Sequence, residues 1–194
     1  MELIFDIFIY AVIAILIVIC ATWVFLIKSM MDSFKLTPYL DKFENKSKST
    51  PKVSIILPAR NEENFIGNCL DSLIKQDYQN YEIIVIDDSS DDSTWKIISE
   101  YAKMNSNIVP VSAKPKPDGW VGKNWACMEG YHKAAGELLL FTDADTNHSK
   151  NVISLAVSHL NSFDLDALSA IPKMLTLDFW TSVTLPMISP FLHT

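Results

Sequence analysis

The sequence predicts an α/β domain whose mostly parallel sheet is covered by helices on both faces, preceded by one transmembrane helix. One long apolar stretch lies near the N-terminus, and it is long enough to cross a bilayer. After it, short β-branched runs alternate with segments of helical periodicity, a pattern typical of parallel sheets. Polar clusters directly follow several of the β-branched runs, as ligand sites do in such sheets.

The composition excludes several classes of protein. The chain has 194 residues, of which 49% are hydrophobic, and a net charge of -7. Apolar residues recur throughout, which excludes intrinsic disorder, and the acidic balance disfavours a nucleic-acid partner. The cysteines Cys20, Cys69 and Cys127 are far apart and lack paired spacing. We therefore expect free thiols in a reducing compartment, with neither a disulfide framework nor a zinc site.

The apolar stretch predicts a membrane anchor. Residues 7–27 carry no charge, and about 20 such residues span the hydrocarbon core as a helix. The alternative, a cleaved signal peptide, needs a basic flank and a small-residue cleavage site. Here Glu2 and Asp6 precede the stretch and bulky residues end it. The retained anchor over residues 1–28 is therefore the favoured interpretation.

The distribution of lysines predicts the orientation of this anchor. Six lysines lie between positions 28 and 52, and none precedes the helix. Because basic residues favour the cytoplasmic side, we expect a single-pass protein of the cell membrane with its globular part in the cytoplasm. Residues 29–51 are interpreted as a basic juxtamembrane linker.

The elements of the globular part follow in order. A β-branched run ends at Pro58, which is expected to stop the first strand. Residues 113–122 are rich in proline and glycine and predict a loop. The alternation gives a domain over residues 52–174. Strands are expected at 52–57, 82–86, 108–112, 137–142 and 166–171, and helices at 63–76, 93–104, 123–135 and 150–161.

Three polar clusters follow predicted strands, at 58–62, 87–90 and 143–145. The carboxyl ends of parallel strands line one crevice, so these residues are expected to converge there. Asp143 and Asp145 can share a hard divalent cation, but the same pattern also occurs as a turn or helix cap, and both alternatives stay open.

The first two clusters have competing interpretations of their own. Asp87 ends a buried strand and can accept hydrogen bonds from a base or ribose, whereas Asp91, Asp92 and Ser93 are expected to cap the following helix. Residues 58–62 can equally be a polar loop whose Glu62 favours the first turn of a helix.

The loop at 118–123 carries two glycines and Lys123 before a predicted helix, a place suited to phosphate groups. It lacks the spacing of a Walker A loop, and no dinucleotide-binding glycine motif occurs. Trp120 and Trp125 are expected in the core more than in a ligand pocket. The four histidines, which have no metal-ligand spacing and are expected to be structural or at the surface, are His132, His148, His159 and His193.

The ordered set PARNEE, DDSSDDST, GWVGKNWA and DADT resembles the family 2 glycosyltransferases, which have the nucleotide-sugar-binding GT-A fold. The blocks at 119–126 and 143–146 are most similar to the membrane-anchored branch that glycosylates carotenoid and hopanoid-type lipids. The resemblance spans about residues 50–175.

This resemblance implies an inverting, metal-dependent transfer of a sugar from a nucleotide-sugar donor, a UDP-sugar more than a GDP-sugar, to a lipid acceptor. Asp143 and Asp145 would bind Mg²⁺ or Mn²⁺, with Asp145 the firmer ligand. The residues implied in nucleotide-sugar binding are Pro58, Ala59, Arg60, Asn61, Glu62, Asp87, Asp88, Lys123, Asp143, Ala144 and Asp145.

The sequence departs from the family pattern after this region. The general base of the family lies well downstream of the DxD motif and is expected beyond Thr194, because Asp178 comes too early. Residues 175–194 are interpreted as an apolar tail that begins a missing acceptor half, and we expect the isolated chain to be marginally stable.

Two other functions remain alternatives. A non-catalytic nucleotide-sugar-binding membrane subunit would need a partner chain for turnover. A nucleotidyltransferase of related fold is disfavoured, because the segment after the first strand has no glycine-rich phosphate loop.

Overall fold

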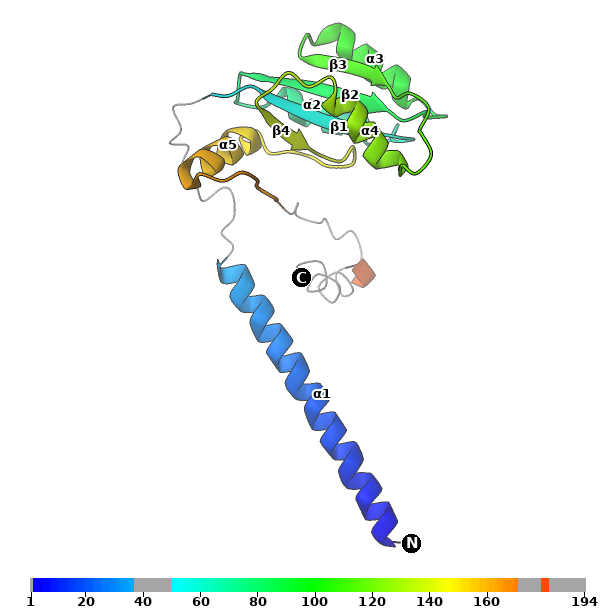
Figure 1. Ribbon diagram of the computed structural model, residues 1–194, viewed down its shortest axis with the longest axis vertical. Coiled ribbons are helices and arrows are strands. Elements are labelled where there is room, and N and C mark those ends of the chain that lie inside the picture. The colour runs from blue at the N-terminus through cyan, green and yellow to red at the C-terminus, as the bar shows by residue number, and fades with distance from the viewer. Residues whose placement is uncertain (1, 37–49, 171–178, 182–194) are drawn as a thin grey trace. The chain divides into compact units, whose positions relative to one another are not determined.

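The computed structural model describes residues 2–36, 50–170 and 179–181 (Figure 1). The chain divides into two compact units, residues 1–39 with 173–194, and residues 40–172. Asp178, His193 and nearly all of the predicted tail lie outside the described residues.

The first unit contains helix α1 (Glu2–Leu36), which extends the predicted helix at both ends. Its segment Leu3–Ser29 is long and apolar enough to cross a membrane. The apolar side chains along it are exposed in the protein, as expected for a helix whose solvent is lipid.

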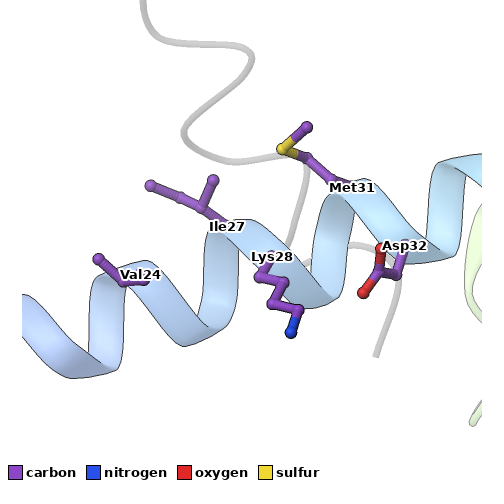
Figure 2. Close-up of a pocket in the computed structure, with 5 residues that line it drawn as sticks. All are labelled: Val24, Ile27, Lys28, Met31 and Asp32. Carbon is purple, nitrogen blue, oxygen red and sulfur yellow. The ribbon is translucent and has the colours of Figure 1, made fainter.

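A shallow hollow of about 340 Å³ lies along the last turns of α1 (Figure 2). All of its lining residues among the described part of the chain come from this one helix, so it brings no chemical groups from different elements together. The lining residues are Val24, Ile27, Lys28, Met31 and Asp32.

The second unit is built on a parallel sheet with the strand order β3-β2-β1-β4 in the described residues. The register places Ala59 opposite Asp87, and Asp87 opposite Ser112, so three strands end at one edge. The fourth ends earlier, with Phe141 opposite Ile56. The strands are β1 (Val53–Ala59), β2 (Tyr81–Asp87), β3 (Ile108–Ser112) and β4 (Leu138–Phe141).

Helices cover both faces of this sheet (Figure 1). Successive strand side chains point to opposite faces, so Ile55 packs in the cluster that includes residues of α2, α3 and α5, and Ile56 packs with Ala126 of α4. The predicted mostly parallel α/β architecture is therefore confirmed. The helices are α2 (Ile66–Ile74), α3 (Thr94–Met104), α4 (Gly122–Tyr131) and α5 (Val152–Phe163).

Two details of the sequence prediction are wrong. Pro58 does not stop β1, which continues to Ala59. The Ile56 carbonyl accepts from Thr142 N, and backbone groups two residues apart point to the same side of a strand. Pro58, which lacks an N–H, therefore faces the side on which β4 has already ended.

The second error is the strand expected at 166–171, because the described residues 166–170 are irregular. Helix α5 ends in a left-handed cap at Asp164, with φ 51° and ψ 51°. The run after it contains Asp, Ala and Ser, which have low β propensity, and most of its side chains are exposed.

Candidate functional site

The ends of β1 and β2 are joined by direct contacts between their first polar residues. Asp88 N donates to the Ala59 carbonyl at 2.9 Å, which continues the pairing of the two strands by one residue. The Arg60 guanidinium lies 3.7 Å from Asp88 Oδ2, with the carboxylate mostly buried and the arginine exposed. Two of the predicted clusters therefore form one surface.

Asn61 fastens the same two loops through its backbone and side chain. It has a φ of 56°, in the left-handed region that asparagine tolerates better than most residues. Its N–H donates to Ser90 Oγ at 3.0 Å, and its Oδ1 accepts from Asp91 N at 2.8 Å. This reciprocal pair fixes the exit of β1 against the exit of β2.

The next residues tie the first loop to helix α3. Glu62 N donates to Thr94 Oγ1 at 2.8 Å. Asp92 accepts from Thr94 N at 2.9 Å and from Glu63 N at 3.2 Å. The capping role predicted for Asp92 is thus present, while Ser93 makes no side-chain cap bond.

Asp87 is the most enclosed acidic residue of the candidate site, with 5% of its surface exposed. Its Oδ2 accepts from Ser90 N at 3.4 Å. Its Oδ1 is buried and has no hydrogen-bond partner among the residues that the structure describes. A buried acceptor without a donor costs about 1–3 kcal/mol. The oxygen is therefore well suited to an N–H or O–H of a bound molecule.

The start of α4 brings the third cluster to the same edge. A Cβ on Gly122 would lie 3.1 Å from Asp88 Oδ2, so the backbone approaches that carboxylate closely. Lys123, the next residue, places its Nζ 2.6 Å from Asp143 Oδ1. This hydrogen bond raises the pKa of the Lys123 ammonium. The positive end of α4 and a lysine thus face the acidic residues.

Alternation around Ala144 exposes both carboxylates of the acidic turn, which we define as residues 143–145. Ala144 is 4% exposed and packs in the core below the sheet edge. Asp143 and Asp145, on either side of it, are exposed. Burial raises the pKa of the Glu62 carboxyl, and the charges of Asp145, Asp92 and Asp143 raise it further. The acidic turn therefore lies within electrostatic range of the first cluster.

The convergence of the three polar clusters at one sheet edge is thus present in the structure. The binding roles assigned to the individual residues stay predictions. Trp120 differs from expectation, because 37% of its surface is exposed and it makes an edge contact with Trp125 at 5.4 Å, outside the buried core.

The donor chemistry of this edge fits a hard divalent cation shared with a ligand. Mg²⁺ is usually held by one or two carboxylates together with substrate phosphates. Asp143 and Asp145 supply two exposed carboxylates. Among the described residues, no three His, Cys, Asp or Glu side chains gather into a ready cage. The residues therefore suit a cation that bridges protein and diphosphate, which needs no such cage.

Sequence reasoning missed the residues that support the acidic turn. Cys69 Sγ donates to the Asp143 carbonyl at 3.6 Å, and Ser72 Oγ accepts from His148 N at 3.0 Å. Burial raises the pKa of the Cys69 thiol to about 11, so it is protonated at neutral pH. The available signal was the presence of polar residues on the buried face of a helix, which need a partner.

Comparison of the sequence with known proteins identifies relatives that transfer sugars. The chain is 37% identical over 109 residues to the 4,4'-diaponeurosporenoate glycosyltransferase of Staphylococcus haemolyticus, covering 55% of this chain and 28% of that protein. It is 34% identical over 121 residues to the poly(ribitol-phosphate) beta-N-acetylglucosaminyltransferase TarS of Staphylococcus aureus, covering 60% and 20%. The chain thus spans less than a third of the length of these relatives.

Solved structures share the fold. The mannosyltransferase PcManGT from Pyrobaculum calidifontis, in complex with GDP-Man and Mn²⁺, superimposes with a TM-score of 0.52 at 25% identity, covering 62% of this chain and 36% of that one. TarS in complex with UDP gives a TM-score of 0.50 at 25% identity, covering 66% and 40%. These neighbours carry the GT-A type of fold, and the Mn²⁺ in one of them suggests a divalent cation.

The sequence model described as glycosyl transferase family 2 matches residues 54–174. This segment contains all three polar clusters and the start of α4, and it makes up more than half of the chain. The chain therefore belongs to glycosyl transferase family 2 and carries a glycosyltransferase domain.

Proposed function

We propose that this chain binds a UDP-sugar together with Mg²⁺ or Mn²⁺ at the sheet edge, as the nucleotide-sugar half of a membrane-anchored, inverting lipid glycosyltransferase. The buried Asp87 Oδ1 carries the proposal, because it is a hydrogen-bond acceptor enclosed by protein and suited to a donor from a ligand. In this arrangement Asp87 and the residues 58–62 hold the nucleoside. Lys123, Asp143 and Asp145 lie at the diphosphate.

The geometry of Asp87 favours uracil over guanine. Guanine presents two neighbouring donors, N1–H and the N2 amino group, and these match a carboxylate with both oxygens available. Asp87 already uses Oδ2 for Ser90 N at 3.4 Å. One buried oxygen is left, which matches the single N3–H donor of uracil. GDP-Man in PcManGT is the precedent for the other base.

The proposed chemistry is a displacement at the anomeric carbon. The acceptor oxygen forms a bond to that carbon as the bond to the diphosphate breaks, and a carboxylate base takes the acceptor proton. A divalent cation supplies neutralisation of charge on the departing nucleoside diphosphate. Lys123 and the N-terminus of α4 contribute positive potential at the same place. The base itself is expected outside residues 58–145.

The membrane part of the proposal is supported by α1. The segment Leu3–Ser29 is long and apolar enough to span a bilayer, and the lysines that follow it favour a cytoplasmic domain. A lipid acceptor fits an enzyme held at the bilayer, and the S. haemolyticus relative is named for transfer to a carotenoid acid. Resistance of the full chain to extraction from membranes by alkaline carbonate tests the anchor directly. Release into the supernatant would contradict it.

Calorimetric titration of the full chain in detergent micelles with UDP, with and without Mn²⁺, tests the nucleotide site. We expect binding that Mn²⁺ tightens by about tenfold. Asp87→Asn is expected to weaken UDP binding by about 10- to 100-fold, and GDP is expected to bind more weakly than UDP. Asp91→Asn is the matched control, because Asp91 contacts Asn61 through its backbone N–H.

Absence of UDP binding in a sample with an intact circular dichroism spectrum would refute the proposal. The alternative, a non-catalytic subunit, predicts the same binding but requires a second polypeptide for sugar transfer. A transfer assay with radiolabelled UDP-sugars and extracted membrane lipids separates the two.

A further inference from the structure

The segment that carries the acidic turn is held by one side of helix α2. We call the side chains of Cys69, Ser72 and Gln76 the α2 polar face. They recur at intervals of three and four residues, which places them on one side of the helix and its C-terminal extension. Their exposed fractions are 1%, 8% and 6%. Three polar residues are thus buried where a core helix normally presents apolar ones.

Each member of the α2 polar face bonds to the segment after β4. Cys69 Sγ donates to the Asp143 carbonyl at 3.6 Å, and Ser72 Oγ accepts from His148 N at 3.0 Å. Gln76 donates to the Ser149 carbonyl at 2.8 Å and accepts from Ile153 N at 3.3 Å. The α2 polar face therefore follows the loop from the acidic turn to the start of α5.

Within the loop, the ring of His148 closes a small network. Its Nε2 lies 2.9 Å from Thr142 Oγ1 and 3.0 Å from Thr146 Oγ1, and the two hydroxyl oxygens are 2.9 Å apart. Thr146 Oγ1 also donates to the Asp143 carbonyl at 2.7 Å. Burial lowers the pKa of His148, so the ring is neutral near pH 7. The network therefore spans the acidic turn from the residue before it to the residue after it.

The Asp143 carbonyl is the point where the two sets of contacts meet. It accepts from Cys69 Sγ, from Thr146 Oγ1 and from Thr146 N at 3.3 Å. A carbonyl held from three directions fixes the backbone from which both carboxylates project. Hydrogen bonds that orient metal ligands typically change metal affinity 10- to 100-fold when removed.

We propose that His148 is a positioning residue: through Thr142, Thr146 and Ser72 it holds Asp143 and Asp145 in the arrangement that binds the cation and diphosphate. This inference rests on the proposed function. It assigns a role to a histidine that bears no metal-ligand spacing, and it makes α2 part of the binding apparatus although α2 carries none of the predicted ligands.

The test compares the full chain with His148→Leu and His148→Gln in detergent micelles, by titration with UDP in the presence and absence of Mn²⁺. The measured quantity is the Mn²⁺ factor, the ratio of the two dissociation constants. His148→Leu is expected to lower the Mn²⁺ factor about tenfold and to change metal-free UDP binding less than twofold. His148→Gln carries its amide where Nε2 lies, and it is expected to restore most of the factor.

His132→Leu is the matched control, because His132 is exposed at the C-cap of α4. Ser72→Ala is a smaller change to the same network and is expected to lower the Mn²⁺ factor about threefold. It keeps the inference testable if His148→Leu does not fold.

Three outcomes overturn the inference. The Mn²⁺ factor is unchanged in a folded His148→Leu or Ser72→Ala; or these variants weaken metal-free and Mn²⁺-dependent binding equally; or His148→Gln loses as much as His148→Leu. A wild-type chain with no Mn²⁺ factor instead refutes the metal dependence in the proposed function, and the inference with it.

Discussion

The Lys123 ammonium lies 2.6 Å from Asp143 Oδ1, a contact between the first turn of α4 and the acidic turn after β4. Both side chains are more than half exposed, so the pair contributes little to the free energy of unfolding. Its significance is electrostatic, because Lys123 is the charge that opposes the mutual repulsion of Glu62, Asp143 and Asp145.

Replacing Lys123 with methionine is expected to have effects of opposite sign on two ligands. Mn²⁺ alone should bind a few times more tightly, because a competing positive charge leaves Asp143. UDP without metal should bind about tenfold more weakly, because the diphosphate loses a charged donor. Calorimetric titrations with each ligand measure both, with Lys133→Met as the control. Equal weakening of both ligands would contradict this assignment.

Glu62→Gln is expected to raise the melting temperature in a pH-dependent way. The folded protein raises the pKa of Glu62 above its ordinary value of 4.5, so ionising this carboxyl destabilises the fold. The destabilisation is fully present above the raised pKa and is lost as the pH falls towards 4.5. The variant should therefore melt higher than the wild type at pH 7 and equally near pH 4. Thermal melts followed by tryptophan fluorescence measure the difference, and a constant gap across this range would contradict the expectation.

Gly130→Ala is expected to destabilise the domain by about 1–3 kcal/mol through overpacking. A Cβ at this position would lie 2.6 Å from Ile86 Cδ1 and 2.8 Å from Ile56 Cγ2, between α4 and the sheet. Gly67→Ala is the matched control, because its Cβ would meet only Tyr101 Oη, at 3.7 Å. Chemical denaturation of both variants tests this difference, and equal stability would mean that α4 shifts without cost.

Asp92→Ala is expected to lower stability by about 1 kcal/mol, the usual contribution of a helix cap. The variant removes the acceptors for Thr94 N and Glu63 N, which couple α3 to the loop after β1. Asp91→Ala keeps the backbone bond to Asn61 and serves as the control. The comparison of the two melting temperatures is the measurement, and a larger loss from Asp91→Ala would assign the cap wrongly.

The order of elements and their approximate bounds could be predicted because they depend on local pattern. The predicted strand at 108–112 agrees with β3 residue for residue, and the long uncharged stretch at the N-terminus forms α1. The predicted strand at 166–171 failed, because a short run of mixed residues becomes a strand only if a neighbour pairs with it. Pro58 was misplaced for a related reason, since its tolerance depends on where β4 ends.

The sequence by itself determined which residues lie at the carboxyl ends of the strands, and so which acidic groups share one edge. Parallel topology brings them together whatever the packing details. Only the tertiary structure decided which contacts they make: the buried free oxygen of Asp87, the pairing of Lys123 with Asp143, and the support of the acidic turn by α2. These depend on side chains more than 20 positions apart meeting within about 3 Å, and hydrogen bonds weaken too steeply with distance for residue spacing alone to specify them.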